Sequence, residues 1–309
     1  MSSGGLPTVA VTTQASPTVL GGTVNAIVTI TGDPDRKVRA AKVRLVRTAL
    51  HRYTNVDVVG HGSHDSLLHE EVVVTEVPII SSDGKVVPGE HVVSLHVPED
   101  GLPSATDQVK WSVRAIIDRR HGIDVKAEAP VEVLAGPERF ASEATAETRY
   151  KGERCIDLEL STRTLRPGET VTGNVLLRPT RAMTVTKVAV TFALTTPVKK
   201  GLEGTAVAPK ILLDEPLDLH PGDTKDLPFD LTLPDDAAPT VRGSMTTPPC
   251  HSIISWDVVA EARSDLSADD KTDLEGFAYL GVNVYNTDVA PPGTTPIPAA
   301  STRSSRAGN

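Results

Sequence analysis

The sequence predicts an all-β protein built from two tandem antiparallel β-sandwiches. Short runs in which apolar and polar residues alternate recur along nearly the whole chain, and the order of these runs occurs twice. The length agrees with this interpretation. A chain of 309 residues exceeds what one hydrophobic core usually holds, and two domains of about 150 residues each are the default.

The two tryptophans mark the repeat. Trp111 lies within residues 109–115 and Trp256 within residues 254–260, and the two segments match at a shift of 145 positions. The chain contains 2 Trp in all, so both occupy equivalent places.

Other short segments repeat in the same order, and only the spacers between them differ in length. The matching pairs are 21–24 with 168–171, 42–45 with 187–190, 88–90 with 221–223, and 97–100 with 233–236. In the last of these pairs, each segment is followed by a proline, Pro103 in the first unit and Pro239 in the second. A set of matches in preserved order, with spacers of different length, indicates a duplicated unit. The sequence therefore predicts one domain copied once, with loop insertions.

The alternation has the two-residue period of a half-buried strand. In one run the apolar positions are Val24, Ala26, Val28 and Ile30, and each Trp falls on the inward row of its own run. Each unit has about seven such runs, which is typical of an immunoglobulin-like sandwich. They lie near residues 8–14, 22–31, 38–54, 67–80, 91–97, 109–117 and 123–134, then 155–163, 169–178, 183–195, 209–217, 224–233, 252–262 and 272–285.

The predicted domains are a first sandwich over residues 8–135, a linker over 136–153, a second sandwich over 154–286 and a disordered tail over 287–309. The linker is richer in Ala, Glu and Thr, and its start at Pro137 could open a short helix. The tail is rich in Pro, Thr, Ser and Ala, so it cannot bury enough apolar surface to offset the entropy of ordering it.

Composition excludes several classes of protein. The net charge of −9 argues against a general binder of nucleic acid or anionic membranes, and 3% aromatic residues are too few for a single-strand stacking platform. No apolar run approaches the roughly 18 residues that a transmembrane helix needs, and the N-terminus shows no signal-peptide pattern. We therefore expect a cytoplasmic protein without integral membrane association, whose 2 Cys cannot form a disulfide framework.

Three segments of the second unit together resemble the arrestin fold. The Pro-Gly-Glu step into the second arrestin strand is resembled by residues 165–173. The Leu-Pro turn and the Pro element that follows it are resembled by residues 227–234 with Pro239. The aromatic-x-Val-x-Ala strand is resembled by residues 256–262. The first unit has weaker copies of these motifs, and the resemblance covers about residues 8–285. Among bacterial proteins the chain is similar to the arrestin-like sporulation-control family.

The resemblance implies a non-enzymatic adaptor or regulator that presents sheet faces and end loops to protein partners. Eukaryotic arrestins read receptor phosphates through basic residues on the first strand, but residues 9–14 here contain no Lys or Arg. Recognition of phosphorylated receptors therefore does not carry over, and the buried ionic cluster between arrestin domains has no counterpart that the sequence locates.

A basic run is the main candidate for binding a partner. It contains no acidic residue between its ends, and strand alternation places Lys42 and Arg44 on the face opposite Val43 and Leu45. Such a row could capture a phosphate, an acidic tail or an acidic patch, or it could be a solvated outer face or an edge protected by cations. The run consists of Arg36, Lys37, Arg39, Lys42, Arg44, Arg47 and Arg52.

Other polar groups have weaker functional readings. His61, His64 and His69 could hold a divalent metal but lack the spacing of a zinc site. Asp265, Asp269, Asp270 and Asp273 cluster without a calcium-loop pattern, and Cys250 and His251, adjacent on an extended chain, point apart. We therefore predict no catalytic residue, no metal and no cofactor, with Cys155 as a small buried residue.

The leading functional hypothesis is a cytoplasmic arrestin-like scaffold that binds protein partners and regulates bacterial development or stress signalling. Two alternatives come from other classes: a surface or carbohydrate-binding sandwich, and a metal-dependent enzyme that uses the loop from His61 to His69. The sequence leaves the partner, the oligomeric state and the motion between the sandwiches open.

Overall fold

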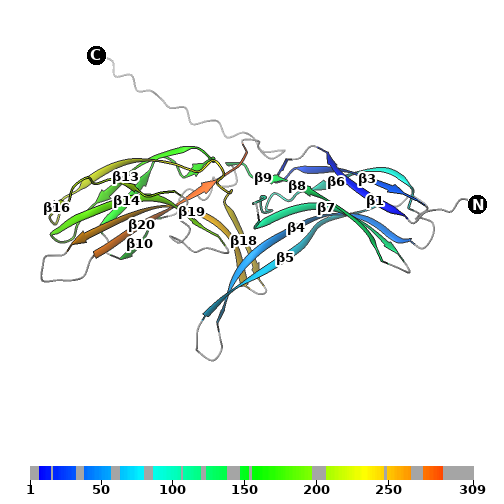
Figure 1. The fold of residues 1–309 in the computed structure, drawn as a ribbon, viewed down its shortest axis with the longest axis horizontal. Coiled ribbons are helices and arrows are strands. Elements are labelled where there is room, and N and C mark those ends of the chain that lie inside the picture. The colour runs from blue at the N-terminus through cyan, green and yellow to red at the C-terminus, as the bar shows by residue number, and fades with distance from the viewer. Residues whose placement is uncertain are drawn as a thin grey trace, which may run out of the picture.

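The protein has two β-sandwich lobes arranged along one long axis (Figure 1). The computed structural model describes residues 7–14, 17–32, 38–56, 63–79, 86–105, 107–119, 123–137, 147–152, 155–196, 207–246, 249–265 and 274–287. Every regular element longer than one residue in these ranges is a strand, which confirms the all-β prediction. None of the described segments is a helix of the length and apolarity needed to cross a bilayer.

The first lobe packs a three-stranded antiparallel sheet on a larger sheet. The small sheet has the order β1-β3-β6, and the part of the larger sheet in this lobe has β4 between β5 and β7, with β8 beside β7. The strands are β1 (Thr8–Gln14), β3 (Thr23–Thr31), β4 (Val38–Val56), β5 (Ser63–Pro78), β6 (Gly89–His96), β7 (Val109–Arg119) and β8 (Val125–Val131).

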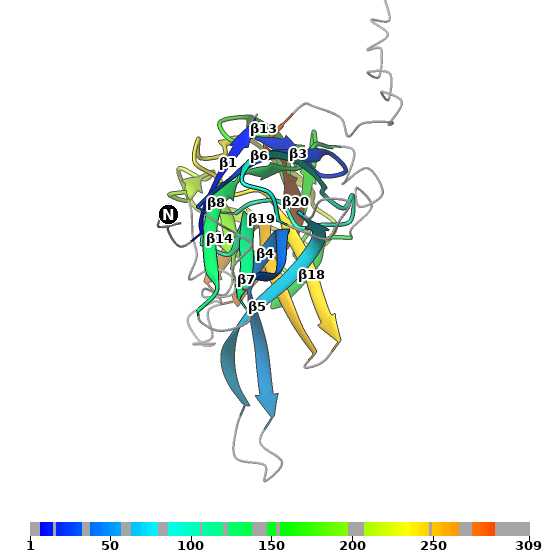
Figure 2. The same ribbon diagram turned by 90° about the vertical axis from the view of Figure 1, so that its right-hand side faces the viewer.

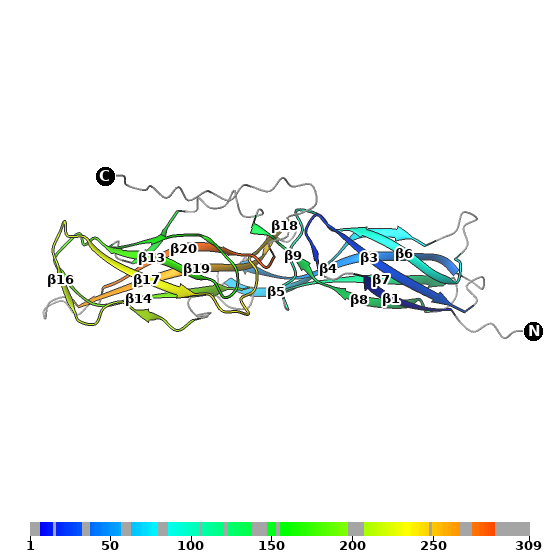
Figure 3. The ribbon, with the colours of Figure 1, turned by 90° about the horizontal axis from the view of Figure 1, so that it is seen from above.

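The second lobe repeats this arrangement. Its small sheet has the order β11-β13-β17, and its larger sheet places β19 between β14 and β20, with β10 beside β20. The strands are β10 (Arg149–Gly152), β11 (Ile156–Leu160), β13 (Thr170–Leu177), β14 (Met183–Thr195), β15 (Lys210–Ile211), β16 (Leu217–Leu219), β17 (Lys225–Thr232), β18 (Val241–Thr246), β19 (Pro249–Asp265) and β20 (Leu274–Val284). Figure 3 looks onto the small sheets of both lobes.

Each lobe also has a short parallel pairing that the alternation pattern did not predict. In the first lobe β2 (Thr18–Val19) pairs with β9 (Val133–Leu134), and in the second β12 (Thr164–Leu165) pairs with β20. Two-residue strands carry too few residues to show a period.

Each lobe has its own hydrophobic cluster with one tryptophan inside it. Trp111 belongs to the first cluster and Trp256 to the second, and each indole is 2% exposed. Burying a large apolar side chain stabilises a fold by roughly 2–3 kcal/mol. The prediction that both rings lie on inward rows is confirmed.

The hydrogen bond of each tryptophan is the same in the two lobes. The indole Nε1–H of Trp111 donates to the carbonyl of Leu102, and that of Trp256 donates to the carbonyl of Ala238, at 2.9 Å in both cases. In both lobes the acceptor is the residue before the proline of the repeat, Pro103 or Pro239. The equivalent turns also use glycine with positive φ, Gly21 at 77° and Gly168 at 81°.

The register corrects one detail of the alignment. Val43 pairs with Ala115, whereas Val190 pairs with Ala260, the residue equivalent to Ala115. Val43 is therefore equivalent to Val190 and not to Val188, so this strand follows the shift of 147 seen for Gly21 and Gly168. A strand keeps its apolar face after a slip of two residues, so the pattern alone could not reveal the difference.

The two lobes are joined through their larger sheets. The pairing of β4 with β7 stops at Ala49, which lies opposite Val109, the first residue of β7. Strand β4 continues beyond this point and pairs with β19 at Arg52 and His251, which makes one twelve-stranded sheet. Val241 and Ile254 of the second half are fully buried and belong to the hydrophobic cluster of the first lobe. Figure 2 shows the β4–β5 and β18–β19 hairpins projecting on the same side of the molecule.

This junction and the end of the predicted linker are more ordered than the sequence suggested. Residues 149–152 form β10, which pairs with β20. The possible helix after Pro137 and the predicted tail beyond residue 287 lie outside the described residues.

Candidate partner-binding face

The outer face of the first lobe's larger sheet carries two of the charged side chains of the basic run. Strand β4 turns Lys42 and Arg44 outward, while Val43 and Leu45 are fully buried. The alternation therefore placed these two cations on the correct side of the sheet.

Arg44 lies in a cross-strand row of four charged residues. The row runs from Glu76 on β5 through Arg44 on β4 and Arg114 on β7 to Glu128 on β8. Two like charges directly opposite each other would destabilise the sheet, but carboxylates flank both arginines. The row is therefore electrically balanced.

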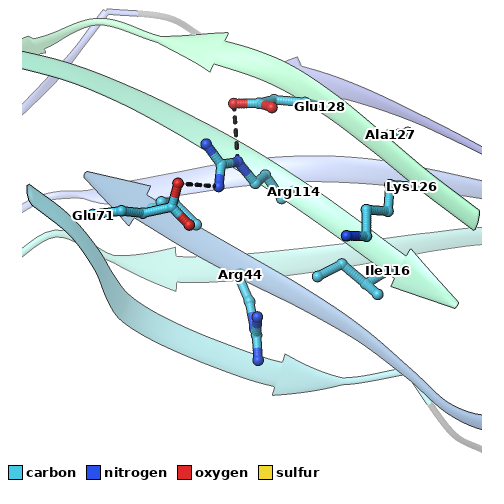
Figure 4. Close-up of a pocket in the computed structure, with 8 residues that line it drawn as sticks. Arg44, Glu71, Arg114, Ile116, Lys126, Ala127 and Glu128 are labelled. Atoms are coloured by element: carbon cyan, nitrogen blue, oxygen red, sulfur yellow. Dashed lines mark ion pairs between the residues drawn. The ribbon is translucent and has the colours of Figure 1, made fainter. Parts of the chain in front are cut away.

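The ion pairs in this row are short and partly exposed. Arg44 Nε lies 2.5 Å from Glu76 Oε2, and Arg114 lies 2.7 Å from Glu71 Oε2 and 3.0 Å from Glu128 Oε1 (Figure 4). The side chains are 25–55% exposed, and exposed ion pairs contribute about 0–1 kcal/mol each. The row fixes side-chain positions more than it stabilises the fold.

The titration of the row agrees with this geometry. The hydrogen bond from Arg44 lowers the pKa of Glu76 below its ordinary value. Partial burial acts to raise the pKa of Glu128, but contacts with Ser112 and Arg114 outweigh it and lower the pKa. The hydrogen bond to Glu71 raises the pKa of Arg114. Glu76, Glu128 and Arg114 are therefore charged at neutral pH.

The adjacent row carries excess positive charge. Lys42 on β4 lies opposite Ile116 on β7, which lies opposite Lys126 on β8. Lys42 is 3.3 Å from Glu76, a carboxylate that it shares with Arg44. Lys126 has no ion-pair partner in the part of the chain that the structure describes. An ammonium group without a counter-ion is available to an acidic ligand.

The two rows border a depression of about 350 Å³ on the sheet face. Its lining includes three cations and two carboxylates, with Lys126 lying beside Ile116 in Figure 4. The lining residues are Arg44, Val46, Glu71, Arg114, Ile116, Lys126, Ala127 and Glu128. The arrangement is suited to binding an acidic group from outside and contains no nucleophile with an adjacent base.

Of the other members of the basic run, the structure describes the side chains of Arg39 and Arg47. Arg39 pairs with Asp118 at 2.6 Å. Arg36 and Lys37 lie outside the described residues, and of Arg52 only the backbone is described. The run therefore contributes two described residues to the face, Lys42 and Arg44.

Arg47 points to the opposite, inward side of β4. It is in register with the buried Trp111, and its Nη2 lies 3.0 Å from Glu70 Oε2. The same carboxylate oxygen lies 2.9 Å from Nε2 of His51, whose side chain is 2% exposed. This cluster lies near the place where β4 meets β19. Arg47 thus belongs to the interior and cannot take part in a row on the outer face.

The second lobe has different residues at the equivalent positions. Register equates Arg44 with Thr191 and Arg114 with Val259. Lys126 and Glu128 are likewise equivalent to Phe277 and Tyr279, whose rings stack at 6.1 Å. The charged depression is therefore specific to the first lobe.

The other sequence candidates are placed as follows. Cys155 is buried, with 5% exposure. His69 is exposed on β5, while His61, Asp269, Asp270 and Asp273 lie outside the described residues, as do the side chains of His64, Cys250, His251 and Asp265. Within the described ranges, no group of three His, Cys, Asp or Glu residues could hold a metal ion. Metal binding by His61, His64 and His69 therefore stays an untested alternative, because His61 and the side chain of His64 lie outside the described residues.

The basic run alone did not identify Arg114, Lys126 or the carboxylates that surround them. The signal was present in the sequence, because Arg114 alternates with Val113 and Ala115 within a predicted strand. What the sequence lacked was the strand order, which brings β5, β4, β7 and β8 side by side.

Comparison with known proteins supports the resemblance in the second half of the chain. A family model described as the SpoOM protein matches residues 151–261. The chain matches no curated protein. The SpoOM family is a sporulation-control family with an arrestin-like fold, which confirms the predicted resemblance to that family. The matched residues cover most of the second lobe and none of the charged face.

Proposed function

From the match of residues 151–261 to the SpoOM family, we propose that the chain is a non-enzymatic, arrestin-like scaffold in the cytoplasm. It binds protein partners and acts in the control of bacterial development or stress signalling. Residues 151–261 alone carry the match to that family.

The observation that carries the proposal is the excess positive charge beside the depression on the first lobe. Lys126 has no ion-pair partner among the described residues, although the chain as a whole has a net charge of −9. A local field of opposite sign attracts and orients an acidic partner. The face also lies outside the part shared with the family, so it is where a partner specific to this chain would bind.

The experiment has two stages. The tagged chain is used to capture proteins from a lysate of the native bacterium, and captured proteins are identified by mass spectrometry. Binding of the purified partner is then measured by calorimetry for the wild type and for the Lys42→Glu, Lys126→Glu double variant. The design avoids Arg44, because its replacement would also release Glu76.

Reversal of both charges is expected to raise the dissociation constant about tenfold or more, because each opposed charge costs on the order of 1 kcal/mol. The matched control is Lys225→Glu, an exposed lysine on β17 of the second lobe, which should leave the constant unchanged. Absence of any saturable partner, or equal binding by the double variant, would contradict the proposal.

A further inference from the structure

Among the described residues, no strand pairs with the outer edge of β6, whereas a proline and a lysine protect the equivalent edge of the second lobe. Both strands are at the margin of a three-stranded sheet, β6 beside β3 and β17 beside β13. Register makes them equivalent, since Val92 pairs with Ile27 and Pro228 pairs with Asn174. The two copies can therefore be compared position by position.

The hydrogen-bond pattern between β3 and β6 shows which backbone groups of β6 point away from β3. The N–H of Val97 donates to the carbonyl of Gly22, just past the end of β6. Because hydrogen-bonded and non-hydrogen-bonded pairs alternate in an antiparallel ladder, the backbone groups of Glu90, Val92 and Ser94 point outward. The outward carbonyl of His96 agrees with this alternation, since the hydroxyl of Thr75 donates to it at 3.0 Å.

The second lobe protects the equivalent positions in two ways. Pro228, which occupies the place of Val92, has no N–H to offer. The ammonium group of Lys210 lies 3.3 Å from the outward carbonyl of Asp230 and 2.6 Å from its carboxylate. Lysine and proline on an edge are devices that prevent strand addition.

The described residues of the first lobe provide neither protection over the middle of β6. Val92 is 69% exposed, the highest value on its strand for a large apolar side chain. No described residue forms a hydrogen bond with the outward backbone groups of Glu90, Val92 or Ser94. Figure 3 shows β6 at the rim of its lobe, with β3 on its inner side. An unpaired edge with an exposed apolar residue is a template for another strand.

The free segment is complementary to itself. Its three outward residues are centred on Val92, so an antiparallel second copy can pair Val92 with Val92 across a two-fold axis. In this register Glu90 lies opposite the partner's Ser94, and no like charges face each other. All three pairs are of the hydrogen-bonded type, which provides about six backbone hydrogen bonds.

From this comparison we infer that two copies of the chain associate through β6, forming a two-fold symmetric, continuous six-stranded sheet from the small sheets of the two first lobes. A C2 interface requires a self-complementary surface, and the segment from Glu90 to Ser94 meets that requirement. The inference is independent of the charged face, which lies on the other sheet of the lobe.

The test is sedimentation velocity across a range of micromolar concentrations. The wild type is expected to show a reversible monomer–dimer equilibrium. Val92→Pro reproduces the residue of the protected copy, and Val92→Lys places two ammonium groups opposite each other. Each variant should raise the dimer dissociation constant about tenfold or more, since like charges or a lost ladder bond act directly at the axis.

Two controls distinguish loss of the β6 interface from misfolding and from nonspecific association through exposed apolar residues. Ile211→Lys removes another exposed apolar residue, 53% exposed on β15 of the second lobe, and should associate like the wild type. Equal thermal unfolding midpoints would show that both Val92 variants fold. A monomeric wild type at every concentration, or dimers unaffected by both variants, would overturn the inference. Capture of a different protein through β6 by a monomeric chain would overturn it as well.

Discussion

Gly173 and Phe229 form a size-compensated pair that can be exchanged for its counterpart. The two residues are in register on β13 and β17, and the equivalent pair in the first lobe is Ala26 opposite Val93. A Cβ atom at Gly173 would lie 2.6 Å from Cζ of Phe229 and would also clash with the backbone oxygen of Glu159. The second lobe therefore combines a larger ring with a smaller residue.

The predicted perturbation is Gly173→Ala, which should lower the free energy of unfolding by about 1–3 kcal/mol, the usual cost of overpacking a core. Phe229→Val alone should cost about 2–3 kcal/mol through the space it leaves. In the double variant the clash with the ring of Phe229 is removed, while the clash with the backbone oxygen of Glu159 remains, so the total cost should stay above zero but fall at least about 1 kcal/mol below the sum.

The assay is urea unfolding followed by fluorescence in a Trp111→Phe reference chain, where Trp256 alone reports on the second lobe. All four combinations of the two substitutions are measured in that reference. Strictly additive effects, or a stabilising Gly173→Ala, would refute the argument that the ring of Phe229 requires glycine opposite it.

Three further outcomes are expected. Trp111→Phe and Trp256→Phe should each cost about 2–4 kcal/mol, since each removes the same hydrogen bond and leaves a void; values differing by more than twofold in urea unfolding would contradict equivalence. Gly168→Ala should cost about 1–2 kcal/mol, because its φ of 81° is left-handed; an unchanged melting temperature would contradict this. The pKa values of Glu76 and Glu128 are depressed in the folded state, so their contribution to stability is present above the unfolded pKa and is lost as the pH falls through the folded pKa. Glu128→Gln should therefore cost stability at pH 7 and progressively less in acid, and a cost independent of pH in unfolding titrations would contradict the assigned ion pairs.

The fold was largely predictable because its signals are local and occur twice. Alternation located most strands, and the two tryptophans set the equivalence of the lobes, since a buried indole needs the same inward position in each copy. The short parallel strands and the joined sheet were not predictable. The pairing of Arg52 with His251 depends on how two distant hairpins meet in space, which no local period encodes.

The candidate face was predictable only in part. Alternation placed Lys42 and Arg44 outward, and the same rule applied to Arg47 would have turned it inward. The carboxylate that balances Arg44, Glu76, comes from β5, more than thirty positions away. Charge along the sequence therefore overstated the charge that the folded surface presents. That Lys126 lies beside this face, without an ion-pair partner among the described residues, follows only from the placement of β8 beside β7.

The most direct test of the duplicated architecture is proton exchange at the two indole nitrogens, measured by nuclear magnetic resonance on the ¹⁵N-labelled full chain. Both Nε1–H groups are buried and donate to an equivalent carbonyl, so both resonances should be strongly protected from exchange with solvent. One protected and one rapidly exchanging indole would show that the rings occupy unlike surroundings, and the equivalence of the two lobes would then be wrong.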